Sequence, residues 1–184
     1  FDGRGVCSDP NLNFMLLGMV NLDSKASNAA YNFIASIGYA DLHAMNIDKR
    51  PVSKVSLGSL RADFVRIGKA EMIGDITARS LIFENQGGSH DIGNISVRSA
   101  SRGNSNTIIL DSEFADAEYE GSANLVEIAE ELKRISIGRE LSSLFSKDVP
   151  DGKGEPASLD VRFHDSRDLM AFIMPGLYIA DSTH

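Results

Sequence analysis

A long run of apolar residues at helical spacing lies between Asp23 and Met45 and constrains the fold more than any other feature. Its members recur at intervals of three and four, which would place them on one buried stripe of a helix: Ala26, Ala29, Ala30, Phe33, Ile34, Ile37 and Ala40. Asp23, Ser24 or Ser27 can cap the first turn, because their side-chain oxygens accept from free backbone N–H groups. The spacing therefore predicts a long helix that the rest of the chain must cover.

Four segments between Val52 and Ala117 alternate apolar and polar residues in the manner of strands. The first segment changes phase, and a bulge at Gly58–Ser59 would restore it. Turn-forming residues separate the segments at short intervals, which favours an antiparallel meander. A helix followed by a meander predicts an α+β fold in which a curled antiparallel sheet wraps one long buried helix.

Further elements are expected on both sides of this unit. Phe14–Val20 is an apolar run that predicts a short buried strand, and Asn124–Phe145 returns to helical spacing. Leu159, Val161 and Phe163 alternate as a strand. The pattern of Leu169–Ala180 favours neither class.

The chain length of 184 residues predicts one domain, because typical domains hold roughly 100 to 150 residues. Residues 1–148 would form it, with the helix after Asn124 included. The composition of 149–156, rich in Gly and Pro, is typical of a linker. Residues 157–184 would then pack on the same domain as a β and apolar extension.

Composition narrows the classes of partner and compartment. A formal net charge of -8 disfavours nucleic acid, whose phosphates repel an acidic surface. The single cysteine, Cys7, cannot form an internal disulfide, so a reducing compartment is expected and the cytoplasm is the predicted location. The longest apolar runs fall short of the roughly 20 residues that cross a bilayer, so no membrane span is predicted.

Three local patterns, in this order, resemble the hot-dog fold of acyl-thioesterases and acyl dehydratases. Asn28-Ala29-Ala30-Tyr31 is similar to the Asn-x-x-Tyr at the start of the buried helix in that family. Ala62–Gly68 followed by Ile73–Ile76 looks like its strand, loop and Gly-Asp pattern. Ile108–Phe114 lies where the family places its closing central strand. The resemblance covers roughly residues 14–117.

The resemblance implies a thioester hydrolase with its site at the start of the helix. Asp23 would activate water or attack the carbonyl, with Asn21 as an alternative at that position and Asn28 also at the site. Tyr31 would contact the acyl group. Asp23 has a second interpretation as an ordinary N-cap, and Tyr31 as a core residue whose hydroxyl reaches the surface.

The substrate would be an acyl thioester of coenzyme A or of an acyl carrier protein. Basic residues along the first two meander strands would meet its phosphates or an acidic carrier, chiefly Arg61, Arg66 and Lys69. No cofactor is implied. No metal is expected either, because His164 and Asp165 lack the ligand spacing of a metal site.

Two alternatives remain open. The chain would be a non-catalytic acyl-binding or protein-binding module, or an acyl dehydratase or isomerase in which His43 or His90 faces a carboxylate. Because hot-dog domains commonly pair, the resemblance also implies a homodimer.

Overall fold

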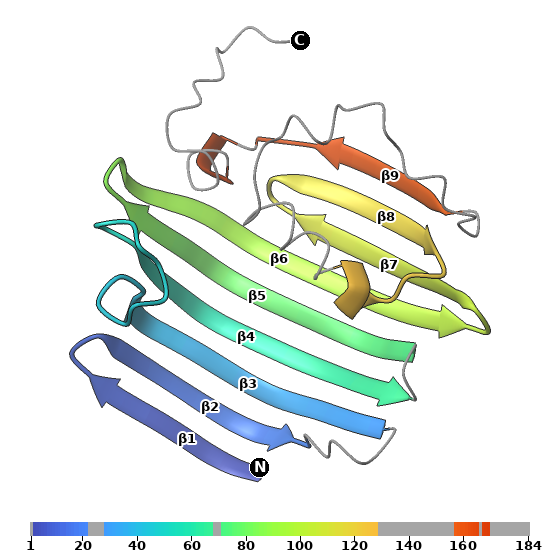
Figure 1. Cartoon of the computed structure of the whole chain (residues 1–184), viewed down its shortest axis with the longest axis horizontal. Helices are drawn as coiled ribbons and strands as arrows, with labels where there is room; N and C mark the ends of the chain where they lie inside the picture. The colour runs from blue at the N-terminus through green and yellow to red at the C-terminus, as the bar shows by residue number, and fades with distance from the viewer. Residues whose placement is uncertain (1, 22–27, 68–70, 129–156, 166, 170–184) are drawn as a thin grey trace, which may run out of the picture.

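The computed structural model describes residues 2–21, 28–67, 71–128, 157–165 and 167–169. These residues form one antiparallel sheet in which each strand pairs with its neighbours in sequence (Figure 1). The sheet contains, in order, β1 (Asp2–Asp9), β2 (Leu12–Val20), β3 (Asn28–Asp41), β4 (Lys54–Ile67), β5 (Glu71–Asn85), β6 (Gly88–Arg102), β7 (Ser105–Ser112), β8 (Ala115–Gly121) and β9 (Ser158–Phe163). It is a single meander.

The prediction of a hot-dog-like α+β fold is wrong, because the segment expected to be the buried helix is strand β3. Alternate residues of β3 face one side of the sheet, including Ala29 and Phe33, while Ile34 faces the other. With apolar residues on both sides, the strand resembles a helix in spacing. The aromatic and β-branched residues among the alanines favour the extended form, and pairing on both edges stabilises it.

The predicted antiparallel meander is confirmed, but the segment predicted as its fourth and last strand is divided by a turn at 113–114, so that strands β4 to β8 take the place of the four expected. The predicted bulge is also confirmed by the register of β3 and β4. Ala35 pairs with Leu60 and Ile37 with Leu57, so the two residues Gly58 and Ser59 lie opposite the single residue Ser36. The segments predicted at 14–20 and 159–163 are strands within β2 and β9, but the expected burial of the first is wrong, because Met15, Leu17 and Met19 are exposed.

Further irregularities lie beside this bulge in neighbouring strands. The pairing shifts at Gly38 between β2 and β3, and at Arg79–Ser80 between β5 and β6. Ser80 has a positive φ of 55°, and its backbone N–H donates to the side chain of Asn94 on β6. Bulges increase local twist and bend a strand, so their alignment in β3, β4 and β5 bends the sheet along one line.

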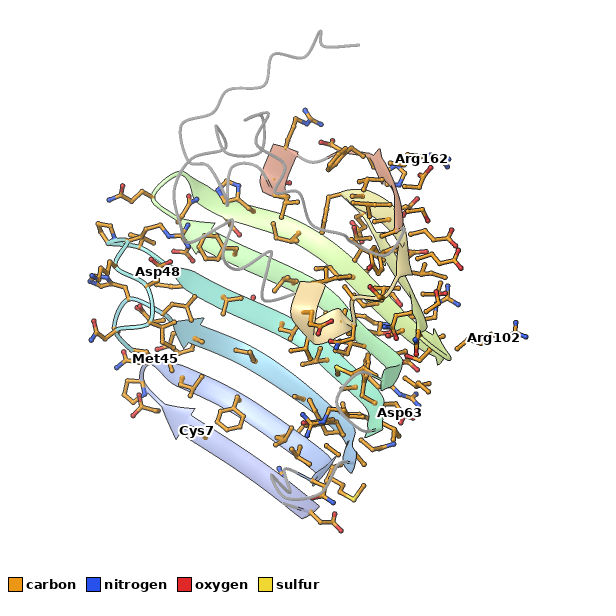
Figure 2. The ribbon with its side chains drawn as sticks, turned by 45° about the vertical axis from the view of Figure 1, so that its right-hand side comes forward. Cys7, Met45, Asp48, Asp63, Arg102 and Arg162 are labelled. Carbon is orange, nitrogen blue, oxygen red and sulfur yellow. The ribbon has the colours of Figure 1, made fainter. Side chains whose placement is uncertain are left out.

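The sheet has two distinct faces, and the residues that the fold buries most lie on one of them. This inner face carries the apolar core of the sheet, including Leu57, Ala62, Phe64, Phe83 and Ile108. The opposite, outer face carries most of the charged side chains of the central strands, including Asp63 at one end of the sheet (Figure 2).

A helical turn at residues 125–128 lies on the inner side of the sheet (Figure 1). The side chain of Asn124 accepts from the N–H groups of Val126 and Glu127, and Glu127 accepts in return from the N–H of Asn124. This is a capping box, and it confirms that a helix begins at Asn124. The rest of the helix predicted to Phe145 lies outside the described residues, as does the predicted linker at 149–156.

A second helical turn covers residues 167–169. Within the described ranges, no helix combines the length and the hydropathy needed to cross a membrane.

Candidate functional site

The candidate site is the inner face of the sheet, where apolar side chains line up across the strands. Tyr31 on β3 pairs with Phe64 on β4, and Phe64 pairs with Gly74 on β5. Gly74 in turn pairs with Ser99 on β6. Because paired residues point to the same side, these pairings make one face continuous from β3 to β6.

The central part of this face is closed to solvent. Phe64 and Phe83 are each 3% exposed, and Ile108 is 7% exposed. The segment after β8 is fastened over one end of it, since the hydroxyl of Tyr119 accepts from the N–H of Ala123 at 3.0 Å. Asn106 reinforces this by donating to the carbonyl oxygen of Ser122 at 3.0 Å.

On β2 and β3, in contrast to Phe64, Phe83 and Ile108, all of the large side chains of the inner face are only half-buried. The set, defined here as the β2–β3 flank, consists of Phe14, Leu16, Val20, Tyr31, Phe33 and Ile37. Its members are in register, with Phe14 opposite Ile37 and Val20 opposite Tyr31. The flank therefore presents a continuous apolar surface that the described residues only partly cover.

The outer side of the same strands is also apolar. This outer patch consists of Val6, Met15, Leu17, Met19 and Ile34. Val6 is 57% exposed, Leu17 54% and Ile34 50%. Val6 pairs with Met15, and Leu17 pairs with Ile34, so the members are contiguous. Contiguous exposed apolar residues mark interaction surfaces.

An arginine at one end of the inner face is fully paired. Arg50, in the connection between β3 and β4, donates from Nε to Asp48 at 2.7 Å, and its guanidinium lies 5.1 Å from the ring centre of Phe83. Asp48 also accepts from the hydroxyl of Ser53, which is completely buried. The hydrogen bonds from Arg50 hold the pKa of Asp48 well below its usual value.

The arginine at the opposite end of β4 has a different environment. Arg66 lies on the inner face, because it follows Phe64 by two residues and pairs with Ala29 and Met72. Its Nε atom is buried and has no hydrogen-bond partner in the part of the chain that the structure describes. Asp48 and Asp63 in Figure 2 mark the two ends of the sheet near which Arg50 and Arg66 lie. Thus, among the residues that the structure describes, the arginine at one end of the face has a carboxylate partner, whereas the Nε atom of the arginine at the other end has no hydrogen-bond acceptor.

Two of the three residues predicted for hydrolysis, Asn21 and Asn28, are among the described residues, after the end of β2 and at the start of β3. Asp23 lies outside the described residues. Asn21 is exposed just after β2, and its backbone N–H donates to the carbonyl oxygen of Ala30 at 2.9 Å. Asn28 is the first residue of β3 rather than part of a helix start. The helix N-terminus that would have supplied the oxyanion site is therefore replaced by strand pairing.

The predicted substrate-binding residues are distributed over both faces. Tyr31 is half-buried on the inner face, opposite Phe64. Arg61 is exposed on the outer face, opposite Ile34, whereas Arg66 is on the inner face. Lys69 lies outside the described residues. Arg61 and Arg66 therefore point away from each other across the sheet.

The candidate histidines lie in different parts of the fold. His43 is exposed in the turn after β3. His90 lies between the side-chain oxygen of Asn85, at 3.1 Å, and Asp168, at 3.3 Å, so it joins the helical turn at 167–169 to the β5–β6 hairpin. His164 contacts Asp116 at 2.8 Å and ties the end of β9 to β8.

A cavity of about 260 Å³ next to His90 is acidic. Its lining includes Asp91, Glu113, Asp165 and Asp168. Hydrogen bonds from Arg167 lower the pKa of Asp165 to about 2. Across the part of the chain that is described, no three His, Cys, Asp or Glu side chains converge in a way that could hold a metal ion.

Sequence reasoning missed the outer patch and the contrast between Arg50 and Arg66. The signal for the outer patch was the unbroken apolar run of β2, since a half-buried strand alternates and a strand covered on both faces does not. The close spacing of Asp48, Arg50 and Ser53 was the only signal for the paired arginine. Nothing local distinguished Arg66 from Arg61.

Comparison with protein-family models, with curated proteins and with solved structures gives no match. Function is therefore inferred from the geometry of the chain itself.

Proposed function

We propose that this chain is a binding module that holds the acyl chain of an amphipathic molecule on the β2–β3 flank. One observation carries the proposal: a continuous apolar face buries Phe64, Phe83 and Ile108 almost completely and leaves Phe14, Leu16 and Phe33 only half-buried. Covering such a surface with an apolar chain is favourable by about 25 cal/mol for each Å² removed from water. The non-catalytic acyl-binding alternative from the sequence is thus the one that the geometry supports best.

The thioester hydrolase stays a prediction. Its proposed acid, Asp23, is outside the described residues, and Asn21 and Asn28 belong to strand-pairing segments. The flank itself requires only that the ligand carry an apolar chain. Acyl thioesters are therefore one possible ligand class among acyl amphiphiles.

Leu16 and Leu17 offer a matched pair of variants, because they are adjacent on β2 and face opposite sides of the sheet. Binding is measured by the displacement of the neutral fluorescent probe N-phenyl-1-naphthylamine by decanol. Leu16→Gln should weaken the binding of the probe and of decanol by about tenfold each, because a polar group then lies under the apolar part of the ligand. Leu17→Gln should leave both affinities within twofold. Equal behaviour of the two variants, or no probe binding by the unaltered protein, would contradict the proposal.

A second candidate function is favoured by the outer patch. Exposed Val6, Leu17 and Ile34 would suit self-association, which agrees with the predicted homodimer. Light scattering after gel filtration would measure the mass. A dimer that Leu17→Gln converts to a monomer, while Leu16→Gln does not, would support this role. A monomer for the unaltered chain at micromolar concentration would exclude it.

A further inference from the structure

Arg66 presents an unsatisfied cationic donor on an otherwise apolar surface. Its Nε atom is buried without a partner among the described residues, and its described neighbours in the ladder on the inner face are Ala29, Phe64 and Met72. None of these neighbours can accept a hydrogen bond through an oxygen of its side chain. A buried donor without an acceptor costs about 1 to 3 kcal/mol, and more when it is charged. Such a group in a folded protein calls for an explanation such as a water, an ion or a ligand.

Pairing within the described chain does not explain it. Of the carboxylates in the ladder near Arg66 whose side chains the structure describes, Asp63 and Asp75 are the closest, and they are paired with each other on the outer face. Asp63 is an odd number of residues from Arg66 with no bulge between them, so the two side chains leave the strand on opposite sides. Arg50, by contrast, has Asp48 beside it at the other end of the face. The fold can thus neutralise an arginine on this face, as it does at Arg50, whereas the described residues offer Arg66 no such carboxylate.

Arg66 lies where the polar end of an amphipathic ligand bound to the β2–β3 flank would lie. It pairs with Ala29, two residues before Tyr31 and four before Phe33, so it lies at one end of the row formed by these flank residues. A chain lying on the flank would bring its polar end to this arginine. The planar guanidinium binds carboxylate and phosphate oxygens in a two-pronged geometry, and such charge-assisted bonds are stronger than neutral ones.

We infer that Arg66 selects amphiphiles with an anionic head group, a carboxylate or a phosphate, whose apolar chain lies on the β2–β3 flank. This rests on the proposed function and adds to it the charge of the ligand and the location of its head. Arg66 is then the residue that determines specificity, and the flank supplies the chain-binding surface.

The test compares decanoate with decanol, which share a chain length and differ in head-group charge, at pH 8 and low salt. Displacement of N-phenyl-1-naphthylamine gives both affinities. The unaltered protein should prefer decanoate by about tenfold or more, which is the value of a charge-assisted hydrogen bond. Arg66→Gln should remove this preference and leave decanol binding within twofold. Arg66→Lys should restore part of the preference, because lysine keeps the positive charge but cannot form the two-pronged hydrogen bonds of a guanidinium.

Arg61→Gln is the matched control, because it removes the same charge from the same strand on the outer face. It should keep the full preference. Acetate and inorganic phosphate should displace no probe, which separates a head-group site from a site for free anions. Circular dichroism and a thermal melt of each variant confirm that it is folded, and Arg66→Lys provides a second reading should Arg66→Gln fail to fold.

The outcomes separate the two proposals. If decanol and decanoate bind equally, or if Arg66→Gln and Arg61→Gln lose the preference alike, the selection by Arg66 is wrong while acyl binding stands. Binding of inorganic phosphate at Arg66 without any effect of the decyl chain would overturn the amphiphile in favour of a free anion. If neither decyl ligand binds, the acyl-binding proposal fails, and the inference fails with it.

Discussion

The inner face has two parts that share one sheet and differ in how far they are covered. On β4, β5 and β7 this face includes side chains that are closed from solvent, with Phe64 and Phe83 each 3% exposed, among half-buried ones such as Leu60 and Ile76. On β2 and β3 the corresponding residues, such as Leu16 and Phe33, are half-buried although their register is equally regular. Hence strand pairing determines which side chains share the inner face. The burial of those side chains then determines which of them belong to the core and which are available to bind a ligand.

The largest contrast should come from removing one phenyl ring from each part. Phe64→Ala opens a cavity in the covered part and should lower the free energy of unfolding by about 3 to 5 kcal/mol. Phe33→Ala removes a side chain that is already half-exposed, and should cost about 1 to 2 kcal/mol. Urea unfolding followed by circular dichroism measures both. Equal losses would mean that the two parts are equally covered in solution.

Two glycines, Gly74 on β5 and Gly5 on β1, allow the stability of the central strands and of the edge to be compared through the backbone. The φ of Gly74 is +144°, and a Cβ at this position would collide with the carbonyl oxygen of Asp63 on β4. Gly74→Ala should therefore destabilise the protein by about 2 to 4 kcal/mol. In Gly5→Ala on β1 the new Cβ would lie 3.8 Å from the Cβ of Leu16, an ordinary contact, so a change within about 0.5 kcal/mol is expected. Thermal unfolding of the two variants measures both changes, and equal losses of stability would contradict the expectation.

The paired end of the inner face should respond to pH through Asp48. Its folded pKa lies below the usual value because of Arg50, so its stabilising contribution is present above about pH 4 and is lost as pH falls toward the folded pKa. Asp48→Asn should cost about 1 to 2 kcal/mol at pH 7.

Urea unfolding of the unaltered protein and of Asp48→Asn between pH 2 and pH 7 tests this. The difference between them should shrink below pH 4. A difference that stays constant down to pH 2 would show that Asp48 acts through its shape and not through its charge.

The smallest effect is expected at the capping box of the helical turn. Asn124→Ala removes the acceptor for the N–H groups of Val126 and Glu127 and should cost about 1 kcal/mol. Because this turn lies on the inner side, hydrogen exchange should rise near residues 122–128, while β2 should exchange as before. Faster exchange throughout β2 would mean that the turn also covers the flank.

The sequence predicted the strands well where apolar and polar residues alternate strictly. The segments within β4, β6 and β9, and even the bulge at Gly58–Ser59, followed from the phase of the pattern. Strand β3 could not be assigned in this way, because Ala30 and Ile34 face outward while Ala29 and Phe33 face inward. A strand with apolar residues on both faces matches helical spacing by chance, and only its pairing partners settle the choice.

The site was harder to predict than the fold, for a related physical reason. Asn21 and Asn28 were assigned to the start of a helix, and that assignment lost its basis when β3 replaced the helix. Arg66 was among the predicted substrate-binding residues, but it was grouped with Arg61, which faces the other side. Which face a residue takes depends on register and bulges over the whole strand, and the burial of Arg66 depends on strands on either side of it.

The most direct test of the central claim is nuclear magnetic resonance of methyl-labelled protein with bound decanoate. Leu16 and Leu17 are neighbours on β2 whose methyl groups lie on opposite faces of the same sheet. Acyl binding on the β2–β3 flank predicts intermolecular nuclear Overhauser effects from the decyl chain to the methyls of Leu16 and none to those of Leu17. Contacts to Leu17 alone, or to neither residue at saturating ligand, would contradict it.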